Sequence, residues 1–479
     1  MKEQRQNKKA KCQGTCKGLF PYLLIFYEIL MVALFGLIKY PTSNYGLDNK
    51  ELEDDLKDHL FLFHQIVIDI NVFVLIGFSF LIVYLRFHRC GALGYTLFAY
   101  VTGMKIYTLF SALWHRSWLS DWDSKFDISL FEIIGAQKCS LAIIITLGSL
   151  IGKVDIFQVF LLSFIESIIY SLNEAILFYQ IQVLDIGGAM SIHTFASVFG
   201  LFTTWIYSNK SNADDNPNSM GNHNTTTISF IGTFFIWIFF PAFNSINPKF
   251  QDEYNNIRFI SMANTFWSIL ASTSISFVLS MLLKNGKFSI EYVQNASISG
   301  GIAIAASCNM FSFPFPALLV GLSAGIISCI SYNFLRRLMN NIHIFETRGI
   351  FHVHGIPGIL GGLISVITTS TLCGKYFGSG TKIQESMLFD RSCSTQSGFQ
   401  LVGLAISFAI GALGGICVGV LFLIWKVVKL PEDTFCDHFS WKMMNEISTS
   451  SQTLSNQVAS KIPIQNINEF PVSRIVISH

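Results

Sequence analysis

Long apolar segments separated by shorter polar segments are the dominant pattern along the chain. Apolar segments fall near residues 20–39, 61–84, 91–113, 128–151, 156–180, 186–207, 227–246, 258–283, 290–312, 315–335, 349–369 and 399–425. A helix needs about 20 mostly apolar residues to cross the hydrocarbon layer of a bilayer, and many of these segments reach that length. The pattern predicts an all-α polytopic membrane protein with about 12 transmembrane helices, two of whose junctions (180–186 and 312–315) are short.

Composition agrees with this prediction and excludes several other classes of protein. Only 13% of the 479 residues are charged and the mean hydropathy is +0.49, whereas a soluble domain averages about 25% charged residues. The net charge of +2 is too small to indicate a nucleic-acid partner. We find no Walker motif, no paired carboxylates arranged for catalysis and no cysteines at zinc spacing. We therefore expect neither an enzyme nor a bound cofactor or metal.

Loop charges predict the orientation of the chain in the membrane. Lys and Arg concentrate in the N-terminal segment and in alternate loops, and the remaining loops are acidic or mixed. Basic loops face the cytosol, so an even number of spans places both termini there. We expect a cytosolic tail over 1–19, a transmembrane domain over 20–428 and a second cytosolic tail over 429–479. Cys373 and Cys393 share one outer loop, where they either form a disulfide or remain free thiols.

A short motif occurs twice, in the sixth and the eleventh apolar segments. Gly188 precedes His193 by five residues and Gly200 follows seven residues later, and Gly349, His354 and Gly361 repeat this spacing. The two segments lie five spans apart, so the halves, roughly 61–207 and 227–369, would have opposite orientations. Such an inverted five-helix, pseudo-two-fold repeat places a transport site near the bilayer midplane, at the interface of the halves.

His193 and His354 are candidates for that site. The simple alternative is two unrelated core histidines, each bonded to a backbone carbonyl, but their matched positions favour a shared site. Desolvation disfavours the charged imidazolium, and two adjacent rings do not both carry a charge. A neutral pair can share one proton and present a donor and an acceptor to an apolar lumen. This chemistry suits a small neutral polar solute such as ammonia better than a hydrated metal ion.

Further polar and aromatic residues of the membrane segments are candidates with open alternatives. Asp185 begins the sixth helix and either orients its neighbours or acts as an ordinary N-cap. Glu174 is either an acidic vestibule residue that attracts cations or a solvated helix end. Phe243 and Asn244 lie in the aromatic segment 239–248, which either gates a pore or forms an interfacial belt.

Several segments resemble Rh glycoproteins of the wider ammonium transporter superfamily. The stretch from Asp185 through His193 to Phe195 resembles their sixth-helix motif, and the stretch 353–362, with His354, resembles their eleventh-helix motif. The stretches 171–174, 241–246 and 294–301 also resemble segments of this family. The stretch 430–441 and a twelfth span are similar to Rh proteins rather than to bacterial ammonium transporters. The resemblance covers residues 20–445 in order.

This resemblance implies a homotrimer with one pore in each protomer and assigns roles to the candidate residues. It implies that His193 and His354 are the twin pore histidines and that Phe243 is a pore-gating phenylalanine, followed by Asn244. Asp185 matches a structural and functional aspartate of the family, and Glu174 matches its acidic vestibule residue. Lys138 is a departure, because it stands where the family has a first gating phenylalanine. A cation there would repel ammonium, unless it snorkels to an interface or the register of the alignment is shifted.

The resemblance implies a channel-like transporter that recruits ammonium, removes its proton and conducts neutral ammonia past the two histidines. Two other functions fit the same sequence. The apolar lumen would also pass carbon dioxide, alone or beside ammonia, and a non-conducting structural or sensing membrane protein would keep the fold. The family default for location is the plasma membrane, with internal vesicle membranes as the alternative.

Overall fold

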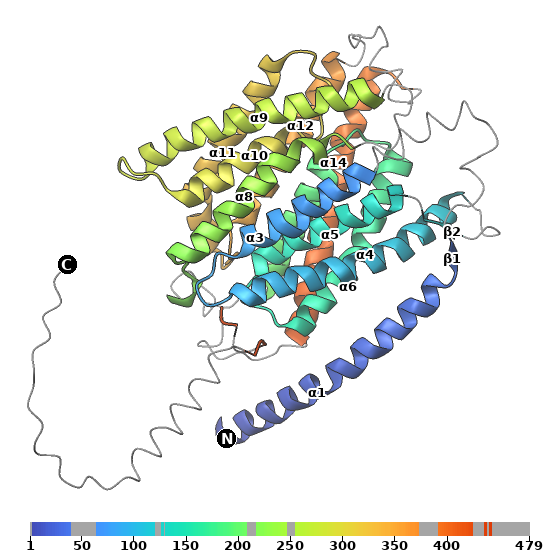
Figure 1. Ribbon diagram of the computed structural model, residues 1–479, viewed down its shortest axis with the longest axis vertical. Helices are drawn as coiled ribbons and strands as arrows, with labels where there is room; N and C mark the ends of the chain where they lie inside the picture. The colour runs from blue at the N-terminus through green and yellow to red at the C-terminus, as the bar shows by residue number, and fades with distance from the viewer. Residues whose placement is uncertain are drawn as a thin grey trace, which may run out of the picture.

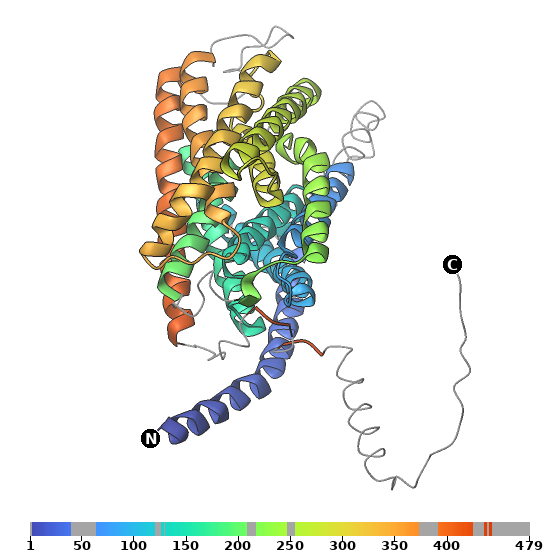
Figure 2. The same ribbon diagram turned by 90° about the vertical axis from the view of Figure 1, so that its left-hand side faces the viewer.

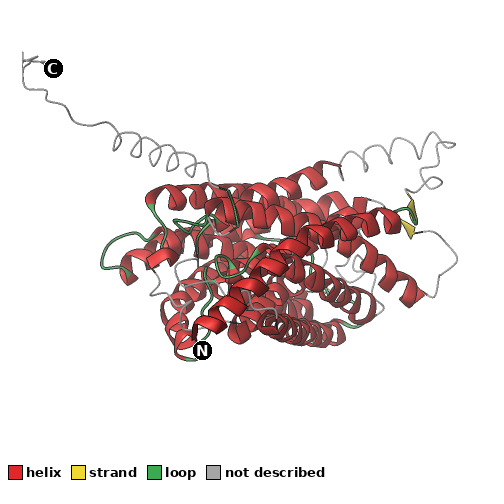
Figure 3. Ribbon diagram, turned by 90° about the horizontal axis from the view of Figure 1, so that it is seen from below, coloured by secondary structure: helices red, strands yellow, loops and turns green. Residues whose placement is uncertain are grey.

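The computed structural model describes residues 2–39, 64–119, 126–128, 130–207, 217–246, 254–372, 391–424, 435–437 and 440–442 of the chain. Helices dominate these residues, and two short strands, β1 (Ile38–Lys39) and β2 (Phe126–Asp127), pair in parallel (Figures 1 and 3). A short 3-10 turn, η5, covers Pro217–Ser219.

The helices follow the apolar segments of the sequence. Their bounds are α1 (Lys2–Phe35), the span His64–Ile82 that includes η1 (Val72–Phe78) and α3 (Ser79–Ile82), α4 (Arg89–Leu119), α5 (Leu130–Leu150), α6 (Ile156–Ala175) with η2 (Ile176–Ile181), η3 (Ala189–Thr194) with α7 (Phe195–Tyr207), α8 (His223–Asn244), α9 (Tyr254–Leu283), α10 (Ile290–Ile304), α11 (Pro314–Asn341), η6 (Phe351–Gly355) with α12 (Ile356–Leu372) and α14 (Cys393–Ile424).

All twelve predicted segments are helical, and ten of the helices within the described residues are long and apolar enough to cross a membrane. The two others are α4 and α10. The prediction of a helix over 290–312 is wrong at its end, because α10 stops at Ile304 after 15 residues. The following backbone turns away from the helix although its residues stay buried. Asn264 on α9 donates hydrogen bonds to the carbonyl oxygens of Cys308 (2.8 Å) and Phe311 (2.7 Å), which satisfies this irregular segment.

Helix α1 lies along the outside of the bundle, and its N-terminal part projects away from it (Figures 1 and 2). Only 11% of the window Gly18–Phe35 is buried. Its contacts with the bundle include a small apolar cluster around Tyr27 and Met31 and an ion pair between Glu28 and Lys105 of α4, at 2.6 Å. The apolar remainder of α1 is the surface expected of a helix that faces lipid.

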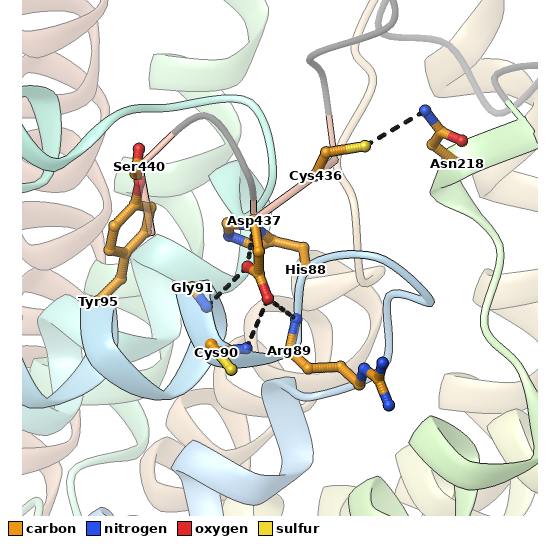
Figure 4. Close-up of polar contacts among 9 residues, drawn as sticks. All are labelled: His88, Arg89, Cys90, Gly91, Tyr95, Asn218, Cys436, Asp437 and Ser440. Atoms are coloured by element: carbon orange, nitrogen blue, oxygen red, sulfur yellow. Dashed lines mark hydrogen bonds and ion pairs between the residues drawn. The ribbon is translucent and has the colours of Figure 1, made fainter. Parts of the chain in front are cut away.

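A segment that follows the last helix lies at one end of the bundle (Figures 1 and 2) and contacts the start of α4 (Figure 4). We call the described residues 435–437 and 440–442 the strap, and this end of the bundle the strap end. Phe435 is 1% exposed and its N–H donates to the carbonyl of Gly152. Asp437 accepts hydrogen bonds from the N–H groups of Arg89, Cys90 and Gly91, which begin α4. The strap therefore joins loops that lie far apart in the sequence.

Small residues let the central helices approach closely. An added Cβ at Gly358 of α12 would lie 2.7 Å from the carbonyl oxygen of Ala189 in η3, and one at Gly361 would lie 2.6 Å from the carbonyl oxygen of Ala303 in α10. Real carbon and oxygen atoms do not approach to this distance, so these contacts require glycine. They bring η3 and α12 together at the centre of the bundle, where the two repeated histidines lie.

Candidate functional site

A left-handed glycine and a π-helical turn place His193. Gly188 has φ +77°, a conformation that favours glycine, and η3 begins directly after it. Asp185 caps this turn, since its Oδ2 accepts hydrogen bonds from the N–H groups of Met190 (3.0 Å) and Ser191 (2.7 Å) and from the Ser191 hydroxyl (2.8 Å). The cap fixes the start of the helix that carries His193.

The second motif repeats this construction around His354. Gly349 has φ +68°, and the π-helical turn η6 contains the histidine. Glu346 lies eight residues before His354, as Asp185 lies eight residues before His193, and its carboxylate oxygens accept hydrogen bonds from the Phe351 N–H at 3.1 and 3.2 Å. Sequence analysis missed Glu346, although this matched spacing was available to identify it.

The two repeated motifs begin at opposite ends of the bundle. Glu346 lines a cavity at the strap end together with Lys153. Asp185 instead interacts electrostatically with Lys138, which precedes Lys153 by a helical stretch of about 20 Å at 1.5 Å per residue. Helix α7, which follows His193, ends at Tyr207, whose hydroxyl contacts Gln158 near the strap end. Opposite starting points are the geometry that the inverted repeat predicts.

The imidazoles of His193 and His354 lie in direct contact. Their Nδ1 atoms are 3.1 Å apart, their ring centroids are 5.2 Å apart and the ring planes differ by 20°. The residues are 0% and 1% exposed. A hydrogen bond between two Nδ1 atoms needs one proton, so one ring keeps a bare Nε2 and the other keeps a protonated Nε2. The pair thus presents one acceptor and one donor, and the Nε2 of His193 has no hydrogen-bond partner among the described residues.

Four phenylalanines form a cluster that reaches the histidine pair through Phe78 and Phe240. Phe243 stacks on Phe73, with ring centroids 4.7 Å apart and planes 19° apart, and Phe240 lies 5.1 Å from Phe73. Phe78 lies 5.7 Å from His354, and Phe240 lies 6.1 Å from His193. Sequence analysis named Phe243 and included Phe240 in the aromatic segment 239–248. The chain contains 45 phenylalanines, and no feature of the local pattern separates Phe73 and Phe78 from ordinary core residues.

A polar group lies at the end of the bundle opposite the strap. Glu174 of α6 is half-buried and accepts a hydrogen bond from the hydroxyl of Tyr107 on α4. Lys138 of α5, also half-buried, interacts electrostatically with the carboxylates of Glu174 and Asp185. Lys138 therefore lies within electrostatic range of the other two predicted residues of this region. Tyr107 was not identified from the sequence.

Asn244 links helices rather than facing this polar group. Its Nδ2 donates to the hydroxyl of Thr265 on α9 at 3.2 Å and to the carbonyl of Gly301 on α10 at 2.8 Å. Its Oδ1 packs closely against Gly187, since a Cβ added to Gly187 would lie only 2.3 Å from this oxygen. These contacts hold the end of α8, and with it Phe243, against the loop that contains Asp185.

A small cavity beside the histidine pair and a larger cavity at the strap end share Arg348 in their linings. A cavity of about 20 Å³, room for about one water molecule, is lined by His354, Phe78, Asn295 and Arg348 among others. Arg348 also lines a cavity of about 570 Å³ at the strap end. Burial lowers the pKa of Arg348 below its usual value, although Glu291, Tyr84 and Tyr332 act against this shift. Sequence analysis missed Arg348, which directly precedes the repeated Gly349.

Two further predictions concern metal binding and a disulfide. Among the described residues, no group of three His, Cys, Asp or Glu side chains could hold a metal ion. Cys393 is disulfide-bonded, and Cys373, proposed from the sequence as its partner, lies outside the described residues.

Comparison with known proteins gives one consistent result. The sequence pattern of the Ammonium Transporter Family matches residues 30–444. The chain is 30% identical to ammonium transporter Rh type B of Mus musculus over 390 residues, which cover 80% of this chain and 84% of that protein. It is 27% identical to ammonium transporter Rh type C of Xenopus laevis over 461 residues, or 92% of this chain and 95% of that protein.

Solved structures show the same fold. The structure of Rh50 from Nitrosomonas europaea superposes with a TM-score of 0.68 at 23% identity and covers 85% of this chain and 98% of its own. Mep2 from Saccharomyces cerevisiae superposes with a TM-score of 0.59 at 14% identity, over 78% of this chain and 86% of its own.

Proposed function

Since this chain belongs to the ammonium transporter family, we propose that it is an Rh-type channel-like transporter that conducts neutral ammonia past His193 and His354. It is a multi-pass membrane protein of a transporter family, not an enzyme. The observation that carries the proposal is the buried histidine pair. Its unshared donor and acceptor match a solute that both accepts and donates hydrogen bonds.

The physical reason for a neutral solute is the cost of moving a cation through this region. A charge near the middle of a bilayer costs several kcal/mol, and the rings next to the pair are those of Phe78 and Phe240, which offer no negative charge. A proton added to either histidine would face the same cost. Ammonium therefore loses its proton before it reaches the pair, and ammonia regains one beyond the small cavity at His354.

The remaining candidates take positioning and recruitment roles in this proposal. Asp185 holds the turn that carries His193 through three hydrogen bonds. Phe243, stacked on Phe73, closes the path beside the pair, and Asn244 fixes the helix end that presents Phe243. Glu174 attracts ammonium to the end of the bundle opposite the strap, and Lys138 limits that attraction through its charge.

The test is solute flux through purified protein in liposomes. An inward ammonium chloride gradient should raise the internal pH faster than in empty liposomes, and His193→Ala with His354→Ala should greatly alter that rate. Unchanged rate and selectivity in the double variant would contradict the proposed path. Absence of any protein-dependent rate would favour the non-conducting alternative.

An apolar path of this kind also admits carbon dioxide. The phenylalanine cluster next to the pair supports this second candidate, because the transfer of an uncharged apolar gas from water into such a cluster costs little free energy. Liposomes loaded with carbonic anhydrase and exposed to a carbon dioxide gradient should then acidify faster with the protein than without it.

We extend the proposal to orientation and assembly. The strap end gathers Lys153, Lys284, Arg336 and Arg337 around one cavity, which supports a cytosolic strap end and cytosolic termini. The family resemblance supports a homotrimer in the plasma membrane, with internal vesicle membranes as the alternative. Native mass spectrometry of the purified protein and imaging of a fluorescent fusion in cells test the two points.

A further inference from the structure

The 570 Å³ cavity at the strap end lies outside the histidine site and has a strongly one-sided charge. Its walls come from the end of α11, the starts of α10 and of the η6 motif, and loops at the strap end, including Phe435 of the strap. Five cationic side chains line it against two carboxylates. The cations are Lys153, Lys284, Arg336, Arg337 and Arg348, and the carboxylates are Glu291 and Glu346.

Both carboxylates are engaged by groups of the protein itself. Glu291 accepts hydrogen bonds from the hydroxyls of Tyr84 and Tyr332, the latter at 3.1 Å. Glu346 accepts from the Phe351 N–H at 3.1 and 3.2 Å. The carboxylates are therefore used to position tyrosines and a helix start, and they do not offset all of the positive charge of the cavity.

Three of the cations form no ion pair with any carboxylate of the described residues: Lys284, Arg337 and Arg348. Arg348 is 9% exposed, and its guanidinium lies 4.2 Å from the centroid of the Tyr84 ring. Its only hydrogen bonds to described residues are long, to the Ser229 hydroxyl at 3.4 Å and to the Leu81 carbonyl at 3.5 Å. A guanidinium has five N–H donors, and the Glu291 carboxylate, which acts on Arg348 electrostatically, forms no ion pair with it. The cavity thus has donors and charge available for an anion.

We propose that this cavity binds an anion that carries a phosphoryl group. Arg presents a planar fork that pairs with phosphate oxygens, and Lys adds a mobile point charge. Several cations spread around a cavity of about 570 Å³ match a ligand with more than one negative charge. A soluble phosphate compound and an anionic lipid headgroup share this chemistry, and basic pockets between transmembrane helices are binding sites for such headgroups.

Such a ligand would also close the conduction path. Arg348 lines both the 570 Å³ cavity and the 20 Å³ cavity that reaches His354. An anion held by Arg348 therefore stands between the histidine pair and the solvent at the strap end. This consequence rests on the proposed function, whereas binding itself does not.

Binding is tested with two probes, sodium pyrophosphate and phosphatidylinositol bisphosphate. Isothermal titration of the purified full-length protein measures the first, and native mass spectrometry after release from nanodiscs that contain the lipid measures the second. The double variant Lys284→Gln with Arg337→Gln should bind at least one of the two probes with an affinity tenfold or more below that of wild type. The matched control is Arg86→Gln, because Arg86 is exposed and is not among the residues lining the cavity.

The outcomes separate the source of the phosphoryl group from the proposal itself. Pyrophosphate binding that the double variant loses supports a soluble ligand, and lipid retention that it loses supports a headgroup. Binding of neither probe, or equal binding by wild type and double variant, overturns the proposal. Citrate that binds as tightly as pyrophosphate overturns the assignment of a phosphoryl group. Circular dichroism of each variant confirms that its helices are intact.

Flux measurements then separate this inference from the proposed function. Saturating pyrophosphate on the strap side of the liposomes should slow protein-dependent ammonia flux at least fivefold in wild type and have little effect in the double variant. Flux that does not change while pyrophosphate is bound overturns the closure. If no variant shows ammonia flux, the proposed function fails, and the titration still decides whether the anion site exists.

Discussion

Replacement of Asp437 should release the strap from the start of α4. The carboxylate accepts backbone hydrogen bonds from Arg89 at 2.9 Å, from Cys90 at 2.7 Å and from Gly91 at 2.7 Å, and lies 3.0 Å from the Nδ1 of His88 (Figure 4). It therefore caps the N-terminus of a helix from a segment nearly 350 residues later in the chain. Burial would raise the pKa of Asp437, but the adjacent His88 ring and the backbone N–H donors hold it below its usual value.

The expected cost follows from these contacts. Loss of a capping side chain costs about 0.5–2 kcal/mol, and one buried donor left without a partner costs about 1–3 kcal/mol. Of the three N–H groups, only that of Gly91 is fully buried. Asp437→Ala should therefore destabilise the start of α4 by about 2–4 kcal/mol. Asp437→Asn keeps one acceptor oxygen and should destabilise the start of α4 by about half as much.

Hydrogen–deuterium exchange of residues 89–91 measures this local opening directly. A change of 1.4 kcal/mol corresponds to a tenfold change in an equilibrium, so Asp437→Ala should speed exchange by about 30-fold or more and Asp437→Asn by less. Ser440→Ala, which removes the 2.8 Å contact with Tyr95, is the matched control and should have a smaller effect. Exchange within about twofold of wild type in Asp437→Ala would refute the capping role.

Two further predictions concern the charged residues at either end of the bundle. Lys138→Met should raise ammonia flux at limiting ammonium by about fivefold, the effect of removing about 1 kcal/mol of repulsion. The control is Lys105→Met, which should leave flux unchanged because Lys105 pairs with Glu28 outside the site. Equal flux in wild type and Lys138→Met would show that Lys138 does not face the path. Burial raises the pKa of Glu346 from 4.5 to about 7, against the opposing hydrogen bond of the Phe351 N–H, so the folded protein binds the proton more tightly than the unfolded chain. This contribution to stability is present below pH 4.5 and is lost as the pH rises through 7, by about 3 kcal/mol. The midpoint of thermal unfolding of wild type should therefore fall over this pH range relative to that of Glu346→Gln. Parallel pH profiles of the two proteins would contradict a raised pKa of Glu346.

Hydropathy alone located the twelve helices, because the length of an apolar segment is set by the thickness of the bilayer. It did not locate their irregular parts. The end of α10 at Ile304 depends on Asn264 of another helix, which supplies the hydrogen bonds that the broken backbone needs. The π-helical turns at His193 and His354 insert a residue into the helical repeat, and a pattern of hydrophobic positions does not register this change.

The candidate site could be predicted where the sequence carried a repeat or a family motif. The spacing around His193 and His354 was visible in the sequence, and the structure brings the two rings to 3.1 Å. Residues without such a signal were missed. Phe73 and Phe78 resemble any core aromatic, and the position of Arg348 between two cavities depends on the packing of several helices.

The central claim is that the solute crosses this protein without charge, and its dependence on membrane potential tests this most directly. Protein-dependent ammonia flux should be measured in liposomes held at 0 and at −100 mV by potassium and valinomycin, after subtraction of empty liposomes. A neutral solute feels no potential, so the two rates should agree. A unit charge that crosses the full potential gains about 2.3 kcal/mol per 100 mV, so a rate that rises many-fold at −100 mV would show that ammonium itself passes and would contradict the account.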